Sequence, residues 1–341
     1  RRKHMLTTLY VNTLFTDHER CLILIRNQEG HGPPTSRAAL LGADGLALYQ
    51  RADGLKRPNM SGVDAIAAQA WATSLDQRKI AAILSSVDGA IEKTQAVIDQ
   101  LGVVKKAMMQ ELLTRGLPGR HTTFKKTEIG MVPEGWEVVA LGQCLREPVR
   151  NGYSPVCPKE PTGRWILHVG AVTPDGFRPS AVKPAPQDDG RLDSATVEPG
   201  DLLVSRSNTR ERVGLAGIYR GTPPACHYPD LLMRVRTGPA LSVDFLELVL
   251  LSERGRDYLS GAARGTSASM VKINREILTN MRVQVPPVAE QQDVVGAVRA
   301  VVANTDCESD VLAALRQMKS ALMSVLLTGE VRVKPDEEAA A

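Results

Sequence analysis

The sequence has few aromatic residues and no paired cysteine motif. Phe, Trp and Tyr together make up 4% of the 341 residues, which disfavours a protein that stacks many unpaired nucleic-acid bases on aromatic side chains. The five cysteines are scattered and form no Cys-x-x-Cys pair, so we expect no zinc ribbon or zinc finger. Scattered cysteines are typical of free thiols in a reducing compartment, and we therefore expect a cytoplasmic protein.

Long apolar runs and common catalytic motifs are also absent from the sequence. No run of about 18 apolar residues is present, so we expect no membrane span, and Asn12, Thr13 and Asp17 interrupt the first apolar run, which disfavours a signal peptide. The patterns GxGxxG, HExxH and GxSxG, the Walker P-loop and the Asn-Pro-Pro-Tyr type of tetrapeptide do not occur. We expect no catalytic residue and no metal site.

The composition permits a folded protein that binds nucleic acid. Hydrophobic residues make up 43% of the chain, enough for a core, and a length of 341 residues favours two domains. The formal net charge is +4. This mild basic excess allows a nucleic-acid partner, but the local clustering of Lys and Arg is what indicates one.

The chain contains an internal repeat. A shift of 214 residues places Gln77 on Gln291 and Leu112-Leu113-Thr114 on Leu326-Leu327-Thr328, with no gap between them. The other identical pairs are Val87 with Val301, Val97 with Val311, Leu101 with Leu315, Lys105 with Lys319, Ala107 with Ala321 and Met109 with Met323. Ungapped self-similarity of this kind indicates two copies of one structural unit.

Both copies have apolar residues seven positions apart. The spaced residues are Ile80, Val87, Leu101 and Met108 in the first copy, and Val294, Val301, Leu315 and Leu322 in the second. Sustained seven-residue spacing predicts long helices that pack side by side. Two similar helices can pair antiparallel and hold whatever lies between them at one end. The alternative is a pair of amphipathic helices in an ordinary helical domain.

The composition changes between the two repeats. Gly116-Leu117-Pro118-Gly119 is typical of a helix end, and Pro286-Pro287 is expected directly before a helix. The predicted order is an N-terminal region without sustained periodicity (1–74), a long helix (75–116), a basic connector (117–135), a strand-rich domain (136–285), a second long helix (286–331) and a disordered tail (332–341).

The region 136–285 predicts an α+β domain. It is rich in Pro and Gly and contains short β-like runs. The predicted strands lie in 165–169, 201–205, 217–219 and 231–235. One helical segment is predicted at roughly 243–260.

Several sequence segments resemble motifs of the specificity subunits of Type I restriction-modification systems. Residues 125–136, which end in Val132-Pro133-Glu134-Gly135-Trp136, resemble the start of that family's target-recognition domain. Residues 76–84 resemble the start of its spacer helix, and 285–292 resemble the exit from the domain into the next helix. The further similar phrases are 200–208, 265–267 and 273–278. The resemblance covers about residues 75–334.

The resemblance implies an α+β fold with one target-recognition domain between two long, antiparallel, coiled-coil-like spacer helices. It implies a non-catalytic chain that binds double-stranded DNA and directs methylation and restriction by modification and restriction subunits. S-adenosylmethionine, ATP and magnesium are then expected in those partners, and no cofactor in this chain. Spacer helices of about forty residues would be about 60 Å long, compared with about 34 Å between successive major grooves.

The N-terminal region departs from the pattern of this family. Members carry two recognition domains, whereas only about 75 residues precede the first predicted helix here. The Pro-Pro-x-x-Glu-Gln phrase before the second helix is replaced by 71–77 before the first. We therefore expect a degenerate or truncated first domain in 1–74, and self-pairing as a half-subunit is one way to complete a two-part DNA site.

Clusters of Arg, Lys and Asn in the predicted loops are the candidate DNA contacts. Guanidinium groups suit guanine edges and phosphates, and an amide suits adenine. The candidate residues are Arg206, Asn208, Arg210 and Arg212, then Lys272, Asn274 and Arg275, and finally Arg150 and Tyr153. The alternatives are a solvated turn for the first cluster and a helix start capped by Asn274 for the second.

Two other functions stay open at this point. The chain could be the recognition portion of a single-chain restriction-methyltransferase, which would need a catalytic domain. It could instead be a non-catalytic helical scaffold or an anti-restriction protein. A DNA mimic needs an acidic face, which the basic net charge disfavours.

Overall fold

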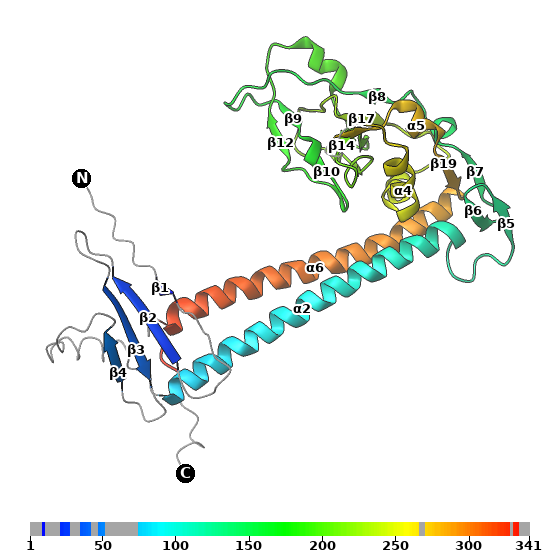
Figure 1. Ribbon diagram of the computed structural model, residues 1–341. Helices are drawn as coiled ribbons and strands as arrows, with labels where there is room; N and C mark the ends of the chain where they lie inside the picture. Colours follow the sequence, from blue (N-terminus) through cyan, green and yellow to red (C-terminus); the bar gives the residue numbers. More distant parts are fainter. Residues whose placement is uncertain are drawn as a thin grey trace. The chain divides into compact units, whose positions relative to one another are not determined.

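The computed structural model describes residues 9–10, 21–27, 35–41, 47–51, 74–265, 270–327 and 330–333. The chain divides into two compact units, one formed by 1–96 with 309–341 and the other by 97–308. Both units contain parts of the two long helices, α2 (Ser74–Arg115) and α6 (Val288–Leu327) (Figure 1). Each unit is described by itself.

The first unit combines a small sheet with one part of each long helix. The sheet is antiparallel in the order β1-β2-β3-β4, with strands Leu9–Tyr10, Cys21–Asn27, Thr35–Leu41 and Ala47–Arg51. In this unit α2 and α6 run antiparallel, because Lys319 pairs with Asp88 (2.6 Å) and Arg316 donates to Gln95 (3.4 Å). The rest of the predicted N-terminal region and most of the predicted disordered tail lie outside the described residues.

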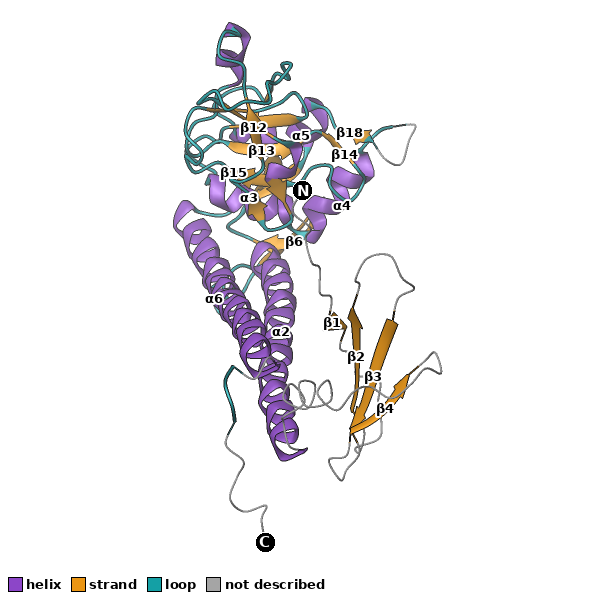
Figure 2. Cartoon of the chain, turned by 90° about the vertical axis from the view of Figure 1, so that its left-hand side faces the viewer, coloured by secondary structure: helices purple, strands orange, loops and turns teal. Residues whose placement is uncertain are grey.

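The second unit holds the α+β domain against the remaining parts of the two helices (Figure 2). Its largest core cluster combines residues of both helices with the sheet and short helices of the domain. The helix residues in that cluster are Met109, Leu112 and Leu113 of α2 and Val294, Val295 and Val298 of α6. The two long helices flanking a β-rich domain confirm the predicted fold class.

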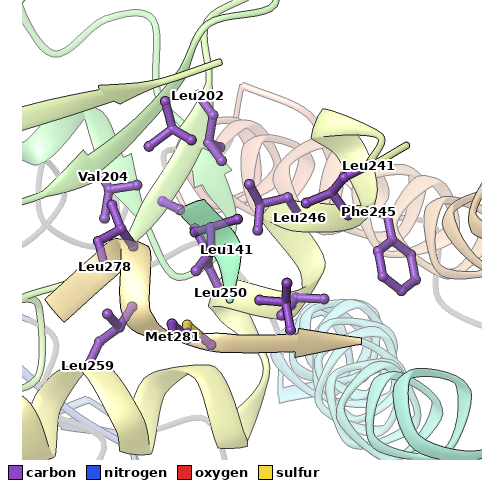
Figure 3. Packing of buried hydrophobic residues seen from close by; sticks show 14 of the residues in the cluster. Leu141, Leu202, Val204, Leu241, Phe245, Leu246, Leu250, Leu259, Leu278 and Met281 are labelled. Carbon is purple, nitrogen blue, oxygen red and sulfur yellow. The ribbon is translucent and has the colours of Figure 1, made fainter. Parts of the chain in front are cut away.

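A four-stranded sheet forms the centre of the second unit, in the order β15-β13-β17-β8. Its strands are β8 (Arg150–Asn151), β13 (Leu202–Ser205), β15 (Ala216–Ile218) and β17 (Leu232–Val235). Leu202 and Val204 pack on the core beside the helices, and Leu203 packs on a second cluster. This alternation buries both faces of β13, as a continuous apolar run predicts, and Figure 3 shows Leu202 and Val204 in the first of the two clusters.

The other strands of the second unit form small sheets. β7 (Glu137–Ala140) pairs with β19 (Arg282–Val285), and β5 (Phe124–Thr127) with β6 (Gly130–Pro133). β9 (Trp165–Leu167) lies between β12 (Val182–Pro184) and β16 (Cys226–His227). β10 (Val172–Thr173) pairs with β11 (Gly176–Phe177), and β14 (Ser207–Asn208) with β18 (Val271–Lys272).

The helices of the domain are α3 (Val243–Leu251), α4 (Glu253–Ala262) and α5 (Arg275–Asn280). The prediction of one continuous helical segment over 243–260 is therefore wrong. Ser252 is extended, and its hydroxyl accepts the N–H of Gly255 (3.2 Å), so it ends α3 and caps α4. In the described part of the chain, no helix is long and apolar enough to cross a membrane.

The four predicted strands are confirmed in β9, β13, β15 and β17. The connector 117–135 contains a feature that its basic composition did not indicate, namely the β5–β6 hairpin. Gly130, with φ of +107°, supplies the backbone conformation that its turn requires.

Candidate DNA interface

Two of the predicted DNA-contact segments lie side by side. Ser207 of β14 pairs with Lys272 of β18, and Asn208 pairs with Val271. The next residue, Ile273, donates its N–H to the carbonyl of Arg206 (2.9 Å). This short ladder joins 206–212 to 272–275 although they are far apart in the sequence.

The third predicted segment joins the same surface through β8. Arg150 and Asn151 pair with Arg234 and Met233 of the central sheet. The Nε of Arg275 donates to the Oδ1 of Asn151 (3.5 Å). This bond brings β8, the strand that contains Arg150, next to the start of α5. We call these three segments (150–151, 206–212 and 272–275) the basic surface.

Several of the predicted side chains on the basic surface are accessible. Arg150, Arg210, Arg212, Lys272, Asn274 and Arg275 are exposed, and Arg206 and Asn208 are half-buried. The Arg206 guanidinium donates to the carbonyl of Asp230 (3.3 Å), and that of Arg210 donates to the carbonyl of Ser260 (2.8 Å). These bonds hold the guanidinium ends of two candidate side chains against the domain.

The two candidate asparagines have local partners. The Oδ1 of Asn274 accepts the N–H of Ile277 (2.8 Å) and caps α5, as the alternative interpretation predicts. The Oδ1 of Asn208 accepts the N–H of Thr209 (2.9 Å). In both residues the amide nitrogen is the group left to donate to a base or a phosphate.

Tyr153 belongs to a different cluster. Its hydroxyl donates to Asp189 (3.0 Å), and the Arg191 guanidinium lies 4.7 Å from its ring centre. The hydrogen bond from Arg191 is the main cause that lowers the pKa of Asp189 to about 2, and burial is the main cause that raises the pKa of Tyr153. Tyr153 is three residues from Arg150, but the structure does not bring its ring to the basic surface.

A partly buried ionic network lies at the start of β13 and the end of β17. Asp201 is 2% exposed and accepts two hydrogen bonds from the Arg236 guanidinium. Arg236 also approaches Glu198 (2.8 Å) and Glu147 (3.4 Å), and these carboxylates raise its pKa, with the Asp201 hydrogen bonds as the largest cause. Arg234 donates to the carbonyl of Thr196 (2.8 Å). These charges are paired inside the domain and are not available to DNA.

Glu290 joins the start of the domain to the start of α6. It is 3% exposed, and its carboxylate accepts the indole N–H of Trp136 (3.1 Å) and lies 2.6 Å from Nε2 of His121. Gly116 ends α2 with φ of +74°, and a Cβ there would lie 2.6 Å from Glu290. The segments 125–136 and 285–292, which contain Trp136 and Glu290, thus meet in one buried junction. The sequence did not indicate this contact.

Two glutamines extend this junction. Gln291 is fully buried and bonds the N–H of Ser242 (2.7 Å) and the carbonyl of Ala240 (2.8 Å). Gln284 donates to the carbonyl of Leu113 (2.9 Å), in the last turn of α2, and accepts from Arg254 (2.5 Å). These bonds fix the domain to both helices within the second unit.

A groove of about 1280 Å³ lies in the second unit, lined by α2, α3, α4 and α6. Ion pairs between Lys105 and Asp175 (3.2 Å) and between Lys106 and Glu253 (3.6 Å) connect residues of its walls. Burial raises the pKa of Glu247, which accepts the N–H of Ile218 (2.9 Å). Among the described residues, no group of three or more His, Cys, Asp and Glu could hold a metal ion.

Comparison with known proteins indicates where this arrangement occurs. No family model matches the sequence. A Type I restriction enzyme MjaVIII specificity subunit of Methanocaldococcus jannaschii is 26% identical over 266 residues, covering 76% of this chain and 61% of the relative. The Type I restriction enzyme EcoKI specificity subunit of Escherichia coli strain K12 is 23% identical and covers 74% of this chain and 54% of the relative.

The similar solved structures include the HsdS subunit from Thermoanaerobacter tengcongensis. It is 18% identical, with a TM-score of 0.46, and covers 74% of this chain and 57% of that one. The chain spans about three fifths of the length of the first curated relatives that it matches. Over about three quarters of its own length, this chain is a homologue of the specificity subunits of Type I restriction enzymes.

Proposed function

We propose that this chain is the specificity subunit of a Type I restriction-modification complex, in which it selects the DNA sequence and performs no catalysis itself. The observation that carries the proposal is the convergence of 150–151, 206–212 and 272–275 on one basic surface. That surface belongs to a domain fixed to two long helices by buried hydrogen bonds. The names of the homologous chains support the same function.

The partners in this proposal are double-stranded DNA, modification subunits and restriction subunits. S-adenosylmethionine, ATP and magnesium belong to those partners, since this chain shows no motif for them. Self-pairing of two copies would place two identical recognition domains on one DNA molecule. A methylated motif with palindromic halves supports self-pairing, and a motif with two different halves contradicts it.

The basic surface can make two kinds of contact with DNA, to phosphates and to base edges. Exposed cations such as Arg150, Lys272 and Arg275 suit phosphates, which position the protein without reading sequence. The Arg206 guanidinium donates one hydrogen bond to the Asp230 carbonyl, and its remaining donors can bind a base edge. Asn208 can add its amide nitrogen.

Arg206→Ala and Lys272→Ala are expected to weaken DNA binding in different ways. Loss of a base-reading arginine should weaken binding to the target motif by about 1–3 kcal/mol and relax one position of it. Loss of a phosphate-contacting lysine should weaken binding to all sequences and reduce the slope of log K against log salt by about 1. Titration of labelled target and scrambled duplexes with the assembled methyltransferase, at several salt concentrations, measures both effects.

Lys183→Ala is the matched control for these variants. Lys183 is an exposed cation on β12, outside the basic surface. We expect its removal to leave the preference for the target duplex and the salt slope close to those of the unmodified protein. If all three variants behave alike, or if the unmodified complex binds target and scrambled duplexes equally, the proposed function is wrong.

A further inference from the structure

The Asp230 carboxylate lies beside the basic surface, outside its three segments. Asp230 lies two residues before β17 (Leu232–Val235), and its carbonyl accepts a hydrogen bond from the Arg206 guanidinium (3.3 Å). Its Oδ1 accepts the hydroxyl of Ser154 (2.5 Å), and its N–H donates to the same hydroxyl oxygen (3.2 Å). Asp230 is half-buried, whereas Ser154 is exposed. The carboxylate is therefore held in one position at the surface.

This carboxylate forms no ion pair with the cations of the basic surface. Arg150, Arg206, Lys272 and Arg275 all belong to the same surface, but no ion pair within 4.0 Å joins a cation of the described chain to Asp230. Its Oδ2 has no hydrogen-bond partner among the described residues, because the bond to Ser154 uses Oδ1. One acceptor atom thus has no donor within hydrogen-bond distance among the described residues.

Backbone packing fixes the loop that carries Ser154. A Cβ on Gly152 would lie 2.1 Å from the carbonyl oxygen of Tyr228 and 2.4 Å from that of Pro229. Only glycine allows this close approach of 150–154 to 228–230. Tyr153 adds a backbone bond to the Tyr228 carbonyl (3.1 Å). The Asp230 carboxylate is consequently presented by two tightly packed backbone segments.

A carboxylate on a surface that meets DNA needs a donor, since phosphates repel it. In the major groove, the donors on base edges are the exocyclic amino groups at N4 of cytosine and N6 of adenine. We propose that Asp230 accepts a hydrogen bond from such an amino group and so specifies cytosine or adenine at one position of the target. Ser154 is the positioning residue that orients the carboxylate. The proposal rests on the proposed function of the chain as a DNA-reading subunit.

Asp230→Asn tests this proposal in the assembled methyltransferase. Asparagine keeps the size of the side chain and an oxygen that accepts from Ser154, but it removes the negative charge. We expect preference for the target over a duplex with one changed base pair to fall about tenfold at one position. Affinity for a scrambled duplex should stay equal or increase, because a repulsive charge is gone. A merely structural role would lower both affinities together.

The DNA itself supplies a second test that does not depend on the folding of a variant. Target duplexes are prepared in which purine replaces one adenine, or 2-pyrimidinone replaces one cytosine, so that a single exocyclic amino group is missing. We expect one such duplex to bind the unmodified complex about tenfold more weakly. The same deletion should cause little further loss with Asp230→Asn, since both changes remove one interaction.

Ser154→Ala is the matched control, because it keeps the Asp230 carboxylate and removes the hydroxyl that donates to it. We expect a smaller loss of preference at the same position and no gain in affinity for scrambled DNA. The proposal is overturned if no amino deletion interacts with Asp230→Asn, or if Asp230→Asn keeps the full preference at every position. A complex that shows no sequence preference before any substitution instead contradicts the proposed function as a whole.

Discussion

Replacement of Glu290 by alanine is expected to destabilise the second unit by about 3 kcal/mol. The carboxylate is buried and accepts the indole N–H of Trp136 and approaches His121 at 2.6 Å. Its removal leaves a buried indole donor without an acceptor and an empty space at the junction with α6. Urea unfolding followed by tryptophan fluorescence measures the change in the free energy of unfolding, and Trp136 itself reports on the junction.

Asp293→Ala is the control for this prediction. Asp293 lies on the same helix and pairs with Arg120 (2.7 Å), but both side chains of that pair are about half exposed. An exposed ion pair contributes little, so we expect no measurable change in the free energy of unfolding. Equal losses for Asp293→Ala and Glu290→Ala would show that the buried junction is not what holds the domain to α6.

Gly152→Ala is expected to disrupt the basic surface and to lower stability by about 3 kcal/mol. The new methyl carbon would lie 2.1 Å and 2.4 Å from two backbone oxygens, which cannot move as the end of a flexible side chain can. The segments 150–154 and 228–230 must then separate, which displaces Arg150 and Asp230. Thermal or urea unfolding measures the stability, and competition between target and scrambled duplexes measures the loss of preference.

Gly135→Ala provides a comparison at a glycine with open space around its Cβ position. No atom outside its chain neighbours lies within 4 Å of that position, so we expect a change below about 1 kcal/mol. Gly152→Ala with unaltered DNA preference would mean that the packing of the two segments does not position the reading side chains.

The helices and the central strands could be predicted because their patterns repeat or persist. The identical pairs 214 residues apart and the seven-residue spacing indicated α2 and α6. The apolar run in 201–205 indicated a strand, which β13 confirms. The break at Ser252 was missed because no proline marks it, and a hydroxyl that caps a helix leaves no periodic signal.

The convergence of the candidate residues could not be predicted from the sequence. The β14–β18 ladder is two residues long on each side, too short to produce a pattern. Clustered arginines indicated which segments to consider, but their mutual distances depend on tertiary packing. Proximity in sequence does not predict which surface a side chain joins. Tyr153 lies three residues from Arg150, but it contacts Asp189 and Arg191 and does not join the basic surface. No sequence pattern indicated Asp230 as a candidate DNA contact.

Sequencing of every methylated position in DNA from cells that express this chain with its modification subunit tests the central claim most directly. We expect methylation confined to one sequence motif, absent without this chain and relaxed at one position by Arg206→Ala. Methylation without regard to sequence, or the same motif in cells that lack this chain, would contradict its role as the subunit that reads DNA.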